Sequence, residues 1–155
     1  MIVIRPAGDD ERDLWYSLLD LAEASKDWTL IGARMVELHV AQAGRTMARM
    51  SRDSDALAGA RGRPHLPCPN LVGALLIKAR AVSVSSRPDD QRRDLALLLS
   101  LVDDPRQCRD QFSARERNWL RARAELDGPE AFFWRELRPE EAQRGLAAYR
   151  YLSSA

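Results

Sequence analysis

The spacing of apolar positions changes near residue 70 of this 155-residue chain. Before it, Ile2 to Ile4 and Trp28 to Ile31 are short apolar, β-prone runs, the length of strands rather than helices. Between them the apolar residues repeat at i, i+4, i+7 and i+8, which predicts an amphipathic helix with its leucine side inward: Leu14, Leu18, Leu21 and Ala22. The first part of the chain is therefore expected to mix strand and helix.

The stretch from Trp28 to Asp55 reads as a strand, a glycine turn, a helix and a pair of carboxylates. Gly32 interrupts the apolar run, and the apolar residues that follow it recur at helical spacing up to Gly44, which is placed to end the helix. Asp53 and Asp55 come after a loop. At i and i+2 they share a face only in an extended segment, because in a helix they would diverge by roughly 200°.

Residues 59–69 contain three prolines and two glycines, which predicts a linker. Beyond it the signals are those of helix starts. The predicted starts are Asn70 as a cap for a helix to Val82, Pro88 with two aspartates, Asp104 with Pro105, a capping box from Ser113 for a helix to Gly128, Pro129, and Pro139. We expect at least four helices in this region and a helical bundle over residues 70–155.

These patterns resemble the nucleotidyltransferase superfamily, in particular its abortive-infection (AbiEii-type) toxin-like branch. The first similarity is the strand, the Gly32-Ala33 turn at a helix start and the Asp53-x-Asp55 strand, although the family has Gly-Gly or Gly-Ser at the turn. The second is LVGALLIKARAV followed by RPDDQRRDLALLL, which resembles the family's lysine helix and its Arg/Asp-Leu helix. Lys78, Arg92 and Asp94 occupy the matching positions.

The resemblance implies binding of a nucleoside triphosphate, with Gly32, Ala33, Lys78, Arg92 and Asp94 as nucleotide-binding residues. It also implies transfer of a nucleoside monophosphate to an RNA or protein acceptor, with Asp53 and Asp55 as catalytic, Mg²⁺-binding residues. Hard carboxylate oxygens suit that ion, which neutralises a triphosphate.

Each candidate also has a structural interpretation. The Asp pair lies in SRDSD, an ordinary solvated turn composition, and Gly32 with Ala33 can be a plain strand-to-helix turn. Lys78 stands on an apolar helix, so its ammonium either reaches water or meets an anion. Arg92 and Asp94 can orient Lys78 or a phosphate, or can form a solvated helix face. His39 and His65 have no partner at ligand or triad spacing.

A third carboxylate is missing where the resembled family places one. Only Ala56 to Asn70 separate Asp55 from the next helix, and this segment has no Asp or Glu. A segment so rich in proline and glycine leaves no room for further central strands. We therefore expect a weak or incomplete active site.

The balance of charges, the lack of a long apolar run and the cysteine spacing exclude several classes of protein. With 24 basic and 23 acidic residues, the chain is not a general nucleic-acid coat protein, and its one local basic stretch runs from Arg61 to Arg87. No run approaches the roughly 18 apolar residues of a membrane span, so we expect a cytoplasmic protein with no membrane partner. Cys68 and Cys108 show neither zinc-site nor disulfide spacing.

The expected fold is α+β and mostly helical, with a small remnant nucleotidyltransferase-like sheet packed against a C-terminal helical bundle. Residues 1–58 are expected to form the α/β unit, 59–69 the linker and 70–155 the bundle of a single domain. Two functions stay open. One is Mg²⁺-dependent nucleoside triphosphate binding with weak nucleotidyl transfer. The other is an inactive relative that acts as a binding or dimerising module, such as a toxin–antitoxin component, with an exposed strand edge favouring a homodimer.

Overall fold

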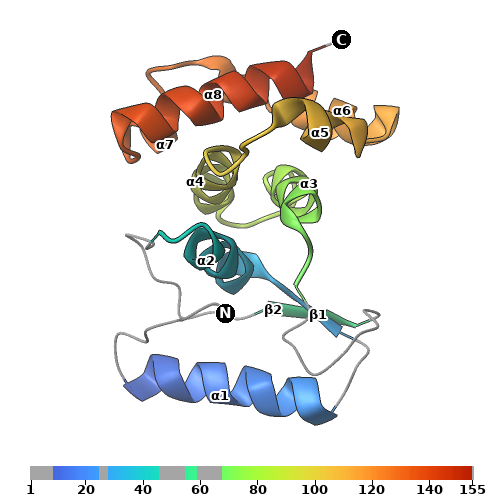
Figure 1. Cartoon of the computed structure of the whole chain (residues 1–155), viewed down its shortest axis with the longest axis vertical. Coiled ribbons are helices and arrows are strands. Elements are labelled where there is room, and N and C mark those ends of the chain that lie inside the picture. The colour runs from blue at the N-terminus through green and yellow to red at the C-terminus, as the bar shows by residue number, and fades with distance from the viewer. Residues whose placement is uncertain (1–8, 25–27, 46–54, 59–67, 155) are drawn as a thin grey trace. The chain divides into compact units, whose positions relative to one another are not determined.

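The computed structural model describes residues 9–24, 28–45, 55–58 and 68–154. They form two compact units, Met1–Pro69 and Asn70–Ala155, and the division falls where the sequence places the start of the helical bundle (Figure 1). The described part is mostly helical with one small sheet. The expected strand at Ile2 to Ile4 lies outside the described residues.

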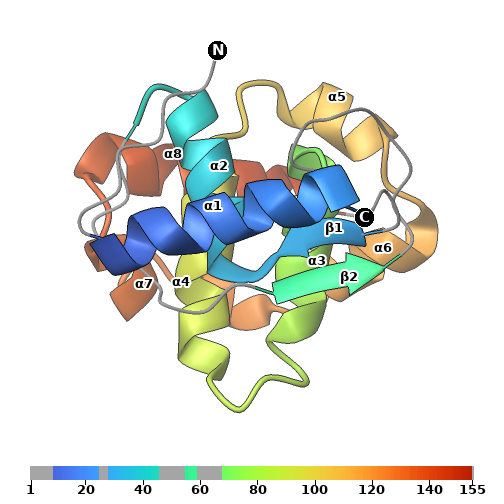
Figure 2. The ribbon, with the colours of Figure 1, turned by 90° about the horizontal axis from the view of Figure 1, so that it is seen from below.

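The first unit contains a helix and a strand–helix–strand segment. In chain order its elements are α1 (Asp9–Ala24), β1 (Trp28–Ile31), α2 (Gly32–Gln42) and β2 (Asp55–Ala58). The strands run antiparallel and side by side, with Trp28 opposite Ala58 and Ile31 opposite Asp55 (Figure 2). Sequence analysis predicted β1 correctly. The second strand was expected at Asp53-x-Asp55, of which only Asp55 is described, and β2 continues from it to Ala58.

Helix α2 ends as its sequence predicts. Ala43 is the last half-helical residue, and Gly44 follows with φ of 69°, a left-handed conformation that a Cβ would strain. The N–H of Gly44 donates to Ala41 O at 3.0 Å, and the N–H of Arg45 donates to Val40 O at 3.0 Å. This is a Schellman motif, and it satisfies carbonyls that the helix end would otherwise leave without a partner.

The inward side of α1 differs from the expected leucine stripe. Trp15 and Leu18 are buried, at 7% and 6% exposure, whereas Leu21 is 39% exposed. The Arg34 guanidinium of α2 lies 5.5 Å from the centre of the Trp15 ring. The aromatic residue, one position after Leu14, thus rotates the buried side of α1 away from Leu21.

The second unit is all-helical within residues 70–154. Its elements are α3 (Leu71–Ala81), α4 (Pro88–Leu99), α5 (Pro105–Asp110), α6 (Ala114–Arg121), the short 3₁₀ helix η1 (Ala124–Asp127), α7 (Phe132–Arg135) and α8 (Pro139–Ser153). Helices α3 and α4 lie side by side, and α8 crosses them (Figure 1). The expectation of at least four helices is confirmed.

Local caps explain where these helices begin. The Asn70 side chain accepts from Gly73 N, Asp104 accepts from the backbone of Arg106 and Gln107, and Ser113 forms a complete capping box with Glu116. Each cap satisfies a backbone donor in the first turn that has no partner inside the helix. These are the residues at which sequence analysis placed the starts.

Two expected helices are wrong in extent. The helix from Ser113 ends at Arg121 instead of Gly128, because the chain turns there and the Arg123 carbonyl accepts from the Tyr149 hydroxyl at 2.8 Å. The helix expected from Pro129 begins only at Phe132. Within this turn Leu126 is fully buried, and its carbonyl accepts from Trp134 Nε1 at 3.0 Å.

Large apolar side chains fill the core of the second unit. Those with at most 2% exposure are Leu75, Leu95, Leu98, Leu99, Leu120, Leu126, Trp134 and Leu152. No helix in the described ranges has both the length and the apolar character needed to span a bilayer.

Candidate functional site

The strand-to-helix junction of the first unit holds the predicted turn. Leu30 is fully buried in β1, Ile31 has extended φ and ψ, and α2 begins at Gly32 with φ of 77°. That positive φ requires a glycine, because a Cβ would clash with the backbone. Ile31 supplies no side-chain cap, and the first turn of α2 has no acidic residue. The N–H groups of this turn carry the positive end of the helix dipole.

Asp55 lies at the same end of the sheet as this junction. The antiparallel register sets the Asp55 backbone opposite Ile31, the residue that directly precedes Gly32. The start of β2 and the start of α2 are thereby brought together from positions more than 20 residues apart. Asp53, the other predicted metal ligand, lies outside the described residues.

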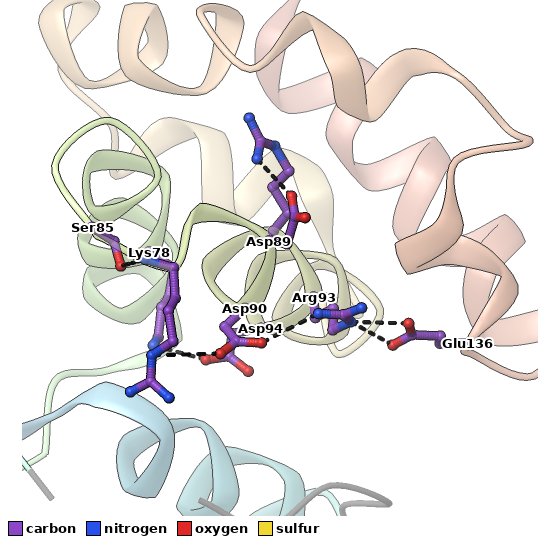
Figure 3. Close-up of polar contacts among 9 residues, drawn as sticks. Lys78, Ser85, Asp89, Asp90, Arg93, Asp94 and Glu136 are labelled. Atoms are coloured by element: carbon purple, nitrogen blue, oxygen red, sulfur yellow. Dashed lines mark hydrogen bonds and ion pairs between the residues drawn. The ribbon is translucent and has the colours of Figure 1, made fainter. Parts of the chain in front are cut away.

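Lys78 lies inside the helical unit and does not reach water. Its side chain is 2% exposed, and Nζ donates to Asp94 Oδ2 at 2.9 Å and to Gln91 Oε1 at 3.0 Å. Asp94, on α4, is also buried, at 4% side-chain exposure. Figure 3 shows Lys78 extended from α3 toward this carboxylate. The interpretation of Lys78 as a lysine reaching solvent is wrong, and the anion that it meets is Asp94.

The two arginines before Asp94 also form ion pairs with carboxylates. Arg92 bonds to Asp89 at 2.9 Å and to Glu125 at 3.1 Å. Arg93 bonds to Asp90 at 3.2 Å and to Glu136 at 2.9 Å (Figure 3). These are partly exposed pairs, which typically contribute less than about 1 kcal/mol each. They link α4 to η1 and to the end of α7.

The predicted site residues thus fall into two groups, one in each unit. Gly32, Ala33 and Asp55 belong to the first unit, and Lys78, Arg92 and Asp94 to the second. Within the second group the structure brings Lys78 and Asp94 into direct contact. Lys78 therefore does not add to the exposed positive charge of the predicted basic stretch, because its ammonium is paired with Asp94 inside the unit.

A polar cluster that sequence analysis missed joins α2 to the end of the linker. His39 Nε2 lies 2.9 Å from Pro69 O and 3.9 Å from Cys68 Sγ. Burial lowers the pKa of His39, and the Pro69 carbonyl opposes this shift. Burial also raises the pKa of the Cys68 thiol to about 11. The signal available in the sequence was a histidine among the apolar positions of a helix.

This cluster is not built for nucleophilic catalysis. A carbonyl only accepts, so Nε2 of His39 carries the proton and donates to Pro69 O. That nitrogen has no lone pair with which to take the Cys68 proton, and a thiol with a raised pKa is a poor nucleophile. We therefore assign His39 a structural role, in which its hydrogen bond to Pro69 O holds the end of the linker against α2.

A metal centre built from several ligands is not present in the described ranges, where no group of three or more His, Cys, Asp or Glu residues is placed to hold an ion. Comparisons of the chain with protein-family models, with curated proteins and with solved structures give no match. The geometry of the two units is therefore the basis of the functional proposal.

Proposed function

We propose that the chain is a nucleotidyltransferase-like protein that binds a nucleoside triphosphate together with Mg²⁺ at the β1–α2 junction of its first unit. The antiparallel register is the observation that supports the proposal: it sets Asp55 opposite Ile31, beside the start of α2 at Gly32, where Ile31 makes no side-chain cap. A helix start with free N–H groups favours phosphate. A carboxylate beside it favours the cation that accompanies a triphosphate.

Asp53 and Asp55 would hold the Mg²⁺, since carboxylate oxygens are the donors that this ion prefers. When bound, the ion supplies neutralisation of the triphosphate charge. The N–H groups of Gly32 and Ala33 would orient the phosphates. The segment Ala56 to Asn70 has no third carboxylate. Loss of one positioning or electrostatic group commonly costs about 10²–10³ in rate. Binding with slow transfer, or with none, to an RNA or protein acceptor is therefore the expected activity.

Calorimetry with the four nucleoside triphosphates, with and without Mg²⁺, tests this proposal on the full chain. Wild type should bind only with Mg²⁺, and Asp53→Asn combined with Asp55→Asn should abolish binding. The matched control removes two exposed carboxylates from the second unit, Asp110→Asn with Glu130→Gln, and should bind as wild type does. Metal-independent binding would exclude the two aspartates as ligands, and rapid transfer to RNA or protein would contradict a weak site.

A non-catalytic helical module is the second candidate. The observation that favours it is the pairing of Lys78 with Asp94 and Gln91 inside the second unit, which leaves this lysine unable to contact a phosphate there. Such a module would act through protein contacts, as a dimer or as a toxin–antitoxin component. The absence of triphosphate binding, combined with a dimer in sedimentation equilibrium, would favour it over the first candidate.

A further inference from the structure

An open groove between the start of α5 and the C-terminal half of α8 lies entirely in the second unit. Its volume is about 430 Å³, within the range of small-ligand pockets. The lining residues are Val102, Asp103, Asp104, Pro105, Arg106, Arg144, Ala147, Ala148 and Tyr151. Val102 and Ala148 are buried at 3% and 1% exposure and form an apolar floor, whereas the charged residues form the rim.

The charges at the rim are of both signs, and two of them have no charged partner. Arg144 donates through Nε to Ser100 O at 2.7 Å, which fixes the guanidinium, but it has no carboxylate within 4 Å among the described residues. Asp103 is exposed and makes no ion pair in the described ranges. Its neighbour Asp104 is different, because it caps α5 by accepting from Arg106 N and Gln107 N.

Some arginines of the second unit meet carboxylates at short distance, as Arg93 meets Glu136 and Arg150 meets Asp127 at 2.6 Å. In the groove, by contrast, Asp103 and Arg144 line one hollow without pairing. A carboxylate and a guanidinium that line the same groove are complementary to a ligand with both charges.

We propose that this groove binds a small zwitterion of the amino-acid type with an apolar side chain. The ligand's ammonium would pair with Asp103 and its carboxylate with the donors of Arg144, which form a planar fork suited to a carboxylate. Its side chain would cover Val102 and Ala148, beside the ring of Tyr151, which is 39% exposed. The inference is independent of the proposed nucleotide site, since it uses only residues of the second unit.

Three probes that differ in charge test the proposal on the full-length chain by amide chemical-shift titration. L-leucine carries both charges, leucinamide lacks the carboxylate, and N-acetyl-leucine lacks the ammonium. We expect leucine to shift the amides of Val102, Asp103, Ala148 and Tyr151, and to bind at least tenfold more tightly than either analogue. Equal affinity of the three probes, or no shift with leucine at tens of millimolar, would overturn the proposal.

A variant of Asp103 then tests whether this carboxylate binds the ligand's ammonium. Asp103→Asn should weaken leucine at least tenfold and leave N-acetyl-leucine unchanged, because that probe has no ammonium. The matched control Asp110→Asn removes an exposed carboxylate at the other end of α5 and should bind leucine as wild type does. Asp103 makes no hydrogen bond or ion pair with another described residue, so folding does not confound its variant. Unchanged leucine affinity in Asp103→Asn would refute the assignment, as would tighter binding of N-acetyl-leucine than leucine, which would identify a site for anions only.

Discussion

Lys78 of α3 and Asp94 of α4 form an ion pair of 2.9 Å inside the helical unit, with 2% and 4% of their side chains exposed. A buried pair contributes little net stability relative to apolar residues, but the loss of one partner leaves the other charge buried and uncompensated. The pair therefore holds α3 and α4 in one arrangement more than it strengthens the fold.

Lys78→Ala should lower the free energy of unfolding by about 3–5 kcal/mol. A lysine whose ammonium reached water would contribute little to stability, so the expected loss follows from the burial of the pair. Lys78→Met with Asp94→Leu should restore most of the loss, because neither charge then remains buried. Denaturant unfolding measures both variants. Arg92→Gln, which removes two partly exposed pairs, is the control, and its cost should stay below about 2 kcal/mol. Equal costs for Lys78→Ala and Arg92→Gln would contradict this account.

Acid should destabilise the first unit through His39. Burial lowers the folded-state pKa of this group below its ordinary value of 6.5, so the unfolded chain binds more protons between the two values. Above about pH 6.5 His39 is neutral in both states and its contribution to stability is complete. The contribution is lost as the pH falls from about 6.5 through the lower pKa of the folded state. Unfolding midpoints of wild type and His39→Gln, measured between pH 7.5 and 5, should converge as the pH falls, because glutamine does not titrate. Parallel curves would show that His39 is not the group responsible.

Gly145 of α8 has no room for a side chain. An added Cβ would lie 2.7 Å from Trp134 Cζ3 and 3.2 Å from Ser100 N, closer than packed atoms allow. Gly145→Ala should therefore cost about 1–3 kcal/mol of stability, as other overpacked cores do. Gly128→Ala is the matched control, because its Cβ would meet only Glu125 O at 3.8 Å. Differential scanning calorimetry should show a lower melting temperature for Gly145→Ala alone.

Helix starts could be predicted from sequence because each depends on a local signal. Asn70, Asp104 and Ser113 cap the helices that directly follow them, within three residues of the groups that they satisfy. Contacts between distant residues leave no such signal. The end of α6 depends on Tyr149, which follows Arg123 by 26 residues.

The candidate site shows the same division between local and distant information. The turn at Gly32 follows from its own sequence, whereas the pairing of Lys78 with Asp94 joins two helices across 16 residues. Sequence analysis left water or an anion open for Lys78 and offered Asp94 as a residue that could orient it, but the buried contact between them could not be inferred. His39 and Pro69, 30 residues apart, were missed for that reason.

Variants of the two glycines at the ends of α2 distinguish an effect on the proposed nucleotide site from an effect on the stability of the helix. Gly32 and Gly44 have similar positive φ values, 77° and 69°, at opposite ends of the helix. Alanine at either position should therefore incur a similar strain of about 1–2 kcal/mol. Only Gly32→Ala should alter the N–H groups beside Asp55. We expect both variants to lower the unfolding midpoint by similar amounts, and Gly32→Ala alone to weaken Mg²⁺-dependent triphosphate binding, by tenfold or more. If calorimetry on the folded proteins shows equal affinity for both variants, the junction does not hold the phosphates.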